Sequence, residues 1–339
     1  MPRPNNLDNY NIEELLQEMR SREAKSEIGI ANFEPEPKED FKSYKSKEII
    51  TALKSKQKVI YGTDNRQDIF EVNNEKILSN ADSVVGLFWA HDVIDNGNNT
   101  STLATRNFGV AHNLCITEPF RDQPVGPFCS GFLVADNIIA TAAHCVDQSN
   151  VTRIRFVFGF RMLDLTTAQE VVNNNEIYNG TAIIDRRLST SGTDWALVRI
   201  DRNVYNHHVA EIRRHGKISN NQALHVIGHP CGLPLKYAPR ANVRDNTPRS
   251  YFVANLDTYG GNSGSPVFNS DTHEVEGILV RGETDFTTGN GCNVSLICPN
   301  TGCSGEDCTR ATEFSDLLPL DDDGKPGKWL ESFLNIMQE

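Results

Sequence analysis

The sequence predicts an all-β fold, either a sandwich or a barrel. From Val59 onward, short runs of β-branched and aromatic residues are separated by Gly, Asn and Asp, and helical apolar patterns are few. No period of roughly 20–50 residues repeats, which excludes a solenoid or a propeller. The expected strands occupy residues 83–88, 130–135, 138–142, 153–159, 195–200, 224–228, 251–255, 265–268 and 275–280.

The beginning of the chain differs from the rest. Residues 1–58 contain eleven Lys and Arg, eleven Asp and Glu, one Gly and no Cys. Ile12–Arg20 and Ser46–Lys56 are weakly amphipathic and predict two short helices, joined by a linker rich in Pro and charge. We expect residues 1–58 to form a loosely packed leader or regulatory arm, and residues 59–339 to form the β-rich domain.

The end of the chain predicts one more helix. Trp329, Phe333 and Ile336 have the i, i+4, i+7 spacing of a single helix face. Such a stripe indicates core packing, so we expect a C-terminal helix that packs on the domain.

Composition excludes several classes of protein. The net charge of −12 argues against a nucleic acid or an anionic membrane as the main partner. The apolar content of 38% and charged content of 23% are those of a globular protein, which excludes disorder of the whole chain. No apolar run approaches the roughly 20 residues of a membrane-spanning helix.

Three short segments carry residues suited to nucleophilic catalysis. They read Thr-Ala-Ala-His-Cys at 141–145, Gly-Thr-Asp-Trp at 192–195 and Gly-Gly-Asn-Ser-Gly-Ser-Pro at 260–266. A serine hydroxyl becomes a good nucleophile when a histidine takes its proton, and a carboxylate orients that histidine. Glycines let backbone N–H groups turn toward a developing oxyanion.

We therefore predict a catalytic triad of His144, Asp194 and Ser263, with the amides of Gly261 and Ser263 as the oxyanion hole. Each segment alone has a simpler explanation, as a core histidine, a turn aspartate or a loop. The order His, Asp, Ser differs from that of subtilisins and of α/β-hydrolases, and position 265 is Ser where the hydrolase elbow needs Gly.

With these motifs, residues 59–338 resemble the chymotrypsin-like, or trypsin-like, serine peptidase family. Residues 128–134 followed by 140–145 resemble its paired-cysteine signature around the histidine. Residues 194–198 resemble its aspartate strand, and residues 261–266 resemble its nucleophile loop. The wording of the nucleophile loop is closest to the bacterial glutamyl-endopeptidase-like branch.

The resemblance implies two packed six-stranded antiparallel β-barrels, with a boundary near residues 205–225 and the active site between them. It also implies a disulfide between Cys129 and Cys145, and residues 308–314 resemble its C-terminal closure. The connectivity of the other six cysteines stays open. Disulfides are favoured over zinc for the four late cysteines, and two more remain as candidates to pair; the four are Cys292, Cys298, Cys303 and Cys308, and the two are Cys115 and Cys231.

The resemblance also suggests a substrate preference. It places Asp257 at the primary specificity position, six residues before the nucleophile, where a carboxylate would select Lys or Arg. Glu306 or Asp307 are further candidates for the wall of that pocket. The alternative is that Asp257 only organises its loop, and the sequence leaves both interpretations open.

Two further departures concern the substrate-pairing strand. Leu279 stands where the glutamyl-specific branch tends to have a histidine, which disfavours cleavage after Glu. The strand also lacks the serine that the family often places beside its catalytic aspartate. Substrate pairing through the backbone of Val280 and Gly282 survives both changes.

Activation is expected to differ from that of animal trypsins. Asn262 precedes the nucleophile, where those enzymes carry an Asp that receives the newly freed N-terminal amine. The composition break and the basic residues 54–58 predict that the leader is a propeptide, cut at Lys58–Val59, and a candidate inhibitor of the enzyme. The alternative is a regulatory arm that stays attached.

The leading hypothesis is a secreted or periplasmic serine endopeptidase that cleaves proteins or peptides as a monomer, without a cofactor or metal. The alternatives are an inactive binding protein on the same fold, a peptidase that prefers small or acidic residues before the cut, and an esterase-like hydrolase. Inactive relatives typically lose a triad member, and none is lost here. The sequence begins without a visible signal peptide, so a cytoplasmic location also stays open.

Overall fold

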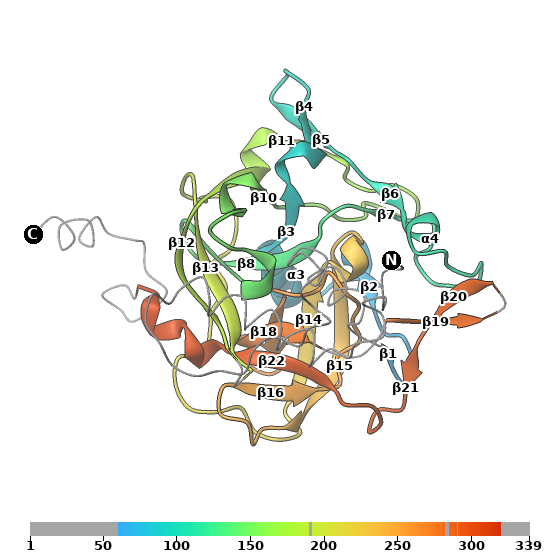
Figure 1. The fold of residues 1–339 in the computed structure, drawn as a ribbon, viewed down its shortest axis with the longest axis vertical. Helices are drawn as coiled ribbons and strands as arrows, with labels where there is room; N and C mark the ends of the chain where they lie inside the picture. Colours follow the sequence, from blue (N-terminus) through green and yellow to red (C-terminus); the bar gives the residue numbers. More distant parts are fainter. Residues whose placement is uncertain (1–59, 190–191, 282–284, 290, 320–339) are drawn as a thin grey trace, which may run out of the picture.

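The computed structural model describes residues 60–319, except 190–191, 282–284 and 290 (Figure 1). The helices expected at Ile12–Arg20, at Ser46–Lys56 and at the end of the chain lie outside these described residues. Within them the chain is mostly β, which confirms the predicted fold class.

The first half of the described chain forms a closed six-stranded barrel. Its strands follow the order β10-β12-β13-β9-β8-β3, and each strand pairs antiparallel with the next. They are β3 (Val84–Trp89), β8 (Cys129–Ala135), β9 (Ile138–Thr141), β10 (Ile154–Val157), β12 (Ile177–Leu188) and β13 (Asp194–Ile200).

The second half forms another closed barrel of six antiparallel strands. The order β14-β17-β18-β22-β16-β15 is closed by pairing of β15 with β14, and β2 (Gln67–Asp68) adds to the free edge of β15. The barrel strands are β14 (Ala223–Gly228), β15 (Lys236–Asp245), β16 (Tyr251–Ala254), β17 (Pro266–Asn269), β18 (Val275–Arg281) and β22 (Glu306–Arg310).

Shorter elements lie outside the two barrels. The helices are α3 (Glu75–Asp82) and α4 (Phe108–Ala111). The strands are β1 (Ile60–Tyr61), β4 (Val93–Asp95), β5 (Thr100–Leu103), β6 (Arg106–Asn107), β7 (Pro124–Val125), β11 (Val171–Asn173), β19 (Phe286–Gly289), β20 (Cys292–Ser295) and β21 (Ile297–Cys298). No helix among the described residues is long and apolar enough to span a membrane.

All nine strands expected from the sequence are present, but three barrel strands were missed. β12 is partly or fully exposed along most of its length, so its sequence shows no apolar run. β15 reads Lys-Tyr-Ala-Pro-Arg-Ala-Asn-Val-Arg-Asp, with a proline and charged residues that resemble a loop. β22 also carries two acids in its five residues. Pairing on both edges overrides these weak local preferences.

One continuous apolar cluster joins the two barrels. Phe132 and Trp195 belong to the first barrel and Phe268 and Ile278 to the second, and each is at most 1% exposed. Burial of such a side chain contributes roughly 1.5–3 kcal/mol. Because the barrels share this core, side chains from both can be held in register at the boundary between them. We call this boundary the seam.

Three disulfides join described cysteines. Cys129 is bonded to Cys145, Cys298 to Cys303, and Cys115 to Cys292. The suggestion that Cys115 pairs with Cys231 is therefore wrong. Cys115 and Cys292 are 177 residues apart in the chain. A backbone hydrogen bond beside the disulfide also joins the two segments, since the Cys115 N–H donates to the carbonyl of Asn293, the residue after Cys292.

The segment between the barrels is held by a charged histidine. His207 Nδ1 donates to Asp82 at the end of α3 (2.8 Å), and its Nε2 donates to Glu176 (2.6 Å). The imidazole also stacks on Phe158 at 3.9 Å. Burial alone would lower the pKa of His207, but the bonds to the two carboxylates raise it to about 9. Both ring nitrogens can donate only in the imidazolium, so this pair of hydrogen bonds, which we call the His207 clamp, depends on a bound proton.

We predict that this clamp gives stability that is lost at alkaline pH. The pKa of His207 is raised above its unfolded value of about 6.5, so its contribution is complete below that pH and disappears as pH rises through about 9. The melting temperature of His207→Asn should therefore lie below that of wild type at pH 6 and approach it near pH 10. His208→Asn, in the exposed neighbour, is the control. A stability gap for His207→Asn that is the same at both pH values would contradict the prediction.

Candidate active site

His144 lies in a single helical turn, Ala143–Cys145, directly after strand β9. The disulfide from Cys145 to Cys129 ties this turn to the start of β8. Arg186 holds its other side, because its Nε donates to the carbonyl oxygens of Ala143 (3.0 Å) and Val146 (2.8 Å). The backbone of the turn is therefore fixed from both sides, and the imidazole has few positions open to it.

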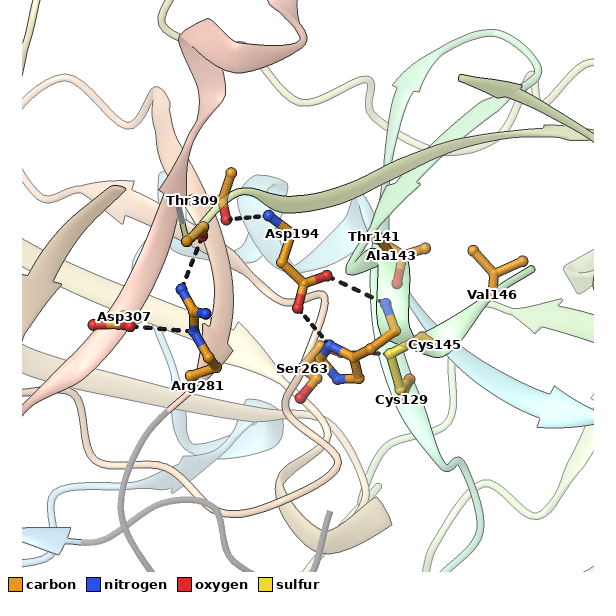
Figure 2. Close-up of polar contacts among 12 residues, drawn as sticks. Cys129, Thr141, Ala143, Cys145, Val146, Asp194, Ser263, Arg281, Asp307 and Thr309 are labelled. Atoms are coloured by element: carbon orange, nitrogen blue, oxygen red, sulfur yellow. Dashed lines mark hydrogen bonds and ion pairs between the residues drawn. A yellow bond between two sulfur atoms is a disulfide. The ribbon is translucent and has the colours of Figure 1, made fainter. Parts of the chain in front are cut away.

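Asp194 is the first residue of β13, and the folded chain buries it completely. Its Oδ2 lies 2.7 Å from His144 Nδ1, and its Oδ1 accepts a bond from the His144 backbone N–H at 3.2 Å (Figure 2). The Asp194 N–H donates to Thr309 Oγ1 of the second barrel at 3.1 Å. Burial alone would raise the pKa of the Asp194 carboxyl, but the nearby His144 and Arg281 hold it below its usual range.

These contacts fix the tautomer of His144. The carboxylate accepts from Nδ1, so the neutral ring carries its proton there and its lone pair is on Nε2. His144 Nε2 is buried and makes no hydrogen bond among the described residues. An imidazole in this state can take a proton from a neighbouring hydroxyl.

Ser263 lies in the loop between β16 and β17 and meets the first barrel through its backbone. Its carbonyl oxygen accepts a bond from the Ser130 N–H of β8 at 2.9 Å and lies 3.8 Å from Cys145 Sγ. The backbone of Ser263 therefore lies against Cys145, the residue that follows His144. Asp194 is bonded to His144, and the loop that carries Ser263 meets the turn that carries His144.

Glycines shape the turn around the nucleophile. Gly261 and Gly264 have φ values of +85° and +91°, which side chains rarely adopt. A Cβ on Gly261 would lie 3.0 Å from the Gly232 nitrogen. The preceding Gly260 N–H donates to both carboxylate oxygens of Asp285 at 3.0 Å. The oxyanion hole of Gly261 and Ser263 amides stays a prediction.

Asp257 faces the beginning of the described chain. Its Oδ1 accepts a bond from the Tyr61 N–H at 2.7 Å, and its Oδ2 accepts one from the Asn65 N–H at 3.3 Å. The residue is 4% exposed, and mainly because of this burial its pKa is raised to about 6. These two bonds tie the segment that precedes β2 to the loop of Asp257, and the role of Asp257 toward a substrate stays a prediction.

The segment before β2 makes a second contact with the nucleophile loop. The Arg66 guanidinium stacks on the Tyr259 ring at 3.9 Å and donates to its hydroxyl at 2.9 Å. Asp64 neutralises that guanidinium through bonds of 2.9 and 2.7 Å. Asn262 in turn donates its N–H to the Tyr259 carbonyl. Residues 61–66 therefore support the loop that carries Ser263.

The other residues predicted to meet the substrate are placed as follows. Val280 is buried in β18, and Gly282 lies outside the described residues. Asp307 pairs with Arg281, and Glu306 is buried in β22. Both acids suggested for the far wall of the pocket therefore lie in strand β22, where Asp307 forms an ion pair with Arg281.

Several polar residues shape the site through contacts that the sequence did not assign to them. Ser130, Thr141 and Thr309 lie inside the motifs quoted from the sequence, but no pattern there indicates which groups they bind. The other three contact groups that are far away in the chain or in another element, and no local pattern indicates those contacts. The full set is Ser130, Thr141, Arg186, Arg281, Asp285 and Thr309.

The described residues hold one cluster with the spacing of metal ligands, and it lies in this site. Atoms of Cys129, His144 and Cys145 are within 4.8 Å of one another. The two sulfur atoms are joined in a disulfide, so they are not the thiolates that bind metals. The arrangement is suited to acid–base and nucleophilic chemistry by side chains.

Comparisons of the sequence with known proteins find peptidases. Residues 129–278 match the family model of the trypsin-like peptidase domain. A glutamyl endopeptidase of Staphylococcus epidermidis is 26% identical over 166 residues, which cover 45% of this chain and 54% of that protein. The glutamyl endopeptidase of Staphylococcus aureus strain MW2 is 28% identical over 166 residues, with coverage of 46% and 48%. The match spans about half the length of these relatives.

Solved structures with a similar chain path include two proteases. A Glu endopeptidase in complex with MPD is 19% identical, covers 76% of this chain and 98% of its own, and has a TM-score of 0.43. The VesB protease of Vibrio cholerae is 15% identical, with coverage of 77% and 66% and a TM-score of 0.44.

Proposed function

We propose that this chain, which carries a trypsin-like peptidase domain, is a serine endopeptidase that works through an acyl-enzyme intermediate. One observation carries the proposal: a fully buried carboxylate is bonded to His144 Nδ1, and Nε2 of the same ring makes no hydrogen bond among the described residues, so its lone pair can accept a proton. A buried carboxylate is costly unless hydrogen bonds or a cation offset the cost, and the bonds from His144 and the charge of Arg281 do so for Asp194.

The reaction follows from these positions. Ser263 Oγ attacks the peptide carbonyl carbon, and its proton passes to His144 Nε2, while Asp194 stabilises the imidazolium that forms. The oxyanion is assigned to the Gly261 and Ser263 amides. Collapse breaks the C–N bond, and the leaving amine takes the proton from His144. Water then attacks the ester with His144 as base, which releases the acid and restores Ser263.

We predict that Ser263→Ala and His144→Ala each abolish peptidase activity without unfolding the protein. Triad members act as a unit, so either change should lower kcat by roughly 10⁴–10⁶-fold. Peptide cleavage and labelling by a fluorophosphonate probe are the measurements, with melting temperature as the control for folding. A folded, processed wild type that fails to label would favour the inactive binding protein, and more than a tenth of wild-type activity in either variant would show that the residue is misassigned.

The substrate preference depends on Asp257. Cleavage after Lys or Arg, as the sequence suggested, needs this carboxylate at the base of the pocket. Its two backbone bonds and 4% exposure support the organising role instead. The relatives named above are glutamyl endopeptidases, so a preference for small or acidic residues is the alternative.

We expect Asp257→Asn to lower kcat/KM for all peptides and to leave the ratio between basic and apolar peptides unchanged. The amide keeps an acceptor oxygen for one backbone N–H but loses the charge that would attract Lys or Arg. A peptide library that varies the residue before the cut measures this ratio in wild type and variant. A fall in the basic-to-apolar ratio of about 30-fold or more would instead place Asp257 in the specificity pocket.

We also propose that residues 1–58 are a propeptide removed at Lys58–Val59. The support comes from the residues that follow: Ile60 and Tyr61 are at most 2% exposed, and the Tyr61 N–H is bonded to Asp257 in the nucleophile loop. A cut beside this buried strand would therefore lie close to a segment that supports Ser263.

N-terminal sequencing of wild type, Lys58→Gln and Ser263→Ala preparations tests this proposal, with turnover measured for each. We expect Val59 at the start of the active enzyme and a longer chain in Lys58→Gln. Full activity with the leader still attached would exclude obligatory removal. A cut that persists in Ser263→Ala would assign processing to another protease.

We propose that the protein works outside the cytoplasm, secreted or periplasmic. Three disulfides among the described residues support this, because such bonds persist in oxidising compartments.

A further inference from the structure

Arg281 crosses the seam between the barrels next to Asp194. It ends β18 in the second barrel, and its side chain is 10% exposed. Its Nη2 donates to the carbonyl oxygen of Gly192 in the first barrel at 2.8 Å, and its Nε lies 3.2 Å from Asp307 Oδ2. Figure 2 draws Arg281 with its bond to Asp307 and Asp194 with its bond to Thr309.

The surroundings of Gly192 leave little room for the Arg281 contact to shift. Gly192 has a φ of +94°, and a Cβ there would lie 2.7 Å from the Tyr251 ring and 3.0 Å from Arg281 Nη2. Gly192 stands two residues before Asp194, whose own N–H is bonded to Thr309. The second barrel therefore holds the start of β13 at two points, through the charged side chain of Arg281 and the neutral side chain of Thr309.

The charge of Arg281 also acts on Asp194. The carboxylate is fully buried, and burial favours its neutral form. The contacts with His144 and the charge of Arg281 offset this cost and hold the pKa of Asp194 below its usual range. Arg186 also lies at the His144 turn, where its Nε is bonded to two backbone carbonyls.

We propose that Arg281 is a positioning residue for the catalytic aspartate, and that the Arg281–Asp307 pair sets how readily His144 binds a proton. The guanidinium holds residues 192–194 of the first barrel in register with the second barrel. Its charge stabilises ionised Asp194 and repels the imidazolium, and Asp307 partly neutralises that charge. The statement about catalysis rests on the proposed peptidase function, whereas the statement about proton binding does not.

The two members of the pair have opposite effects in this scheme. Without Arg281 the imidazolium loses a repelling charge, so His144 keeps its proton to higher pH. Without the carboxylate of Asp307 the guanidinium charge is no longer balanced, so His144 loses its proton at lower pH. A purely structural role would not produce shifts of opposite sign.

The test measures the proton affinity of His144 directly and through activity. Imidazole NMR titration, with the His144 signal assigned by its loss in His144→Ala, is run beside the pH profile of kcat/KM. We expect the His144 midpoint and the acid limb to move up by roughly 0.5–1 pH unit in Arg281→Met and down by roughly half a unit in Asp307→Asn. Arg281→Lys keeps the charge but loses the planar fork, so its midpoint should stay near that of wild type while kcat falls.

Arg213→Met is the matched control, because Arg213 is also an arginine paired with a carboxylate, that of Glu276 on β18. It should leave the His144 midpoint unchanged. Shifts of the same sign in Arg281→Met and Asp307→Asn, or shifts no larger than that of Arg213→Met, would overturn the proposal. If Arg281→Met does not fold, the downward shift in Asp307→Asn and the unchanged midpoint in Arg281→Lys decide the question. If the variants show the expected NMR shifts but the wild-type enzyme is not labelled by the fluorophosphonate probe, the peptidase function alone is overturned.

Discussion

The site depends on one backbone hydrogen bond across the seam, from the Ser130 N–H of β8 to the carbonyl oxygen of Ser263. This bond joins the nucleophile loop of the second barrel to the first barrel, which carries His144 and Asp194. The Ser130 side chain reinforces it, because its hydroxyl accepts from the His229 N–H and contacts the Gly261 carbonyl. Ser130 is completely buried, so these bonds do not compete with water.

The same contact explains the glycine after the nucleophile. A Cβ on Gly264 would lie 2.0 Å from the Ser130 carbonyl oxygen and 2.4 Å from Thr141 Oγ1, which is itself bonded to that carbonyl. Any side chain would push the loop away from β8 and β9, and Ser263 with it. The Gly-Asn-Ser-Gly motif that identified the loop in the sequence therefore reflects the close packing of Gly264 against β8 and β9 as well as the turn.

The sequence predicted those parts of the fold and site that depend on neighbours in the chain. The buried strands β8 and β18 contain the apolar runs 132–135 and 278–280, and His144 and Ser263 lie in tight turns whose glycines and small residues are local. The exposed β12 and the charged β15 gave no such signal.

The contacts that complete the site could not be predicted in this way. Arg281 meets Gly192 over 89 residues, and Asp194 meets Thr309 over 115. Such partners are set by the register of the two barrels, which no local pattern encodes.

The surroundings of Asp257 show why the sequence alone leaves the substrate preference open. The family resemblance assigns Asp257 to the specificity position, but strand β1 and the turn at Asn65 approach its carboxylate and supply two N–H donors. A carboxylate that accepts two backbone bonds at 4% exposure has fewer open positions for a substrate cation than the same residue at the base of an empty pocket. The surroundings of this carboxylate therefore depend on the chain before β2. That segment also supports the nucleophile loop through Arg66 and Tyr259, so the surroundings of Asp257 and of Ser263 depend on the same residues 61–66.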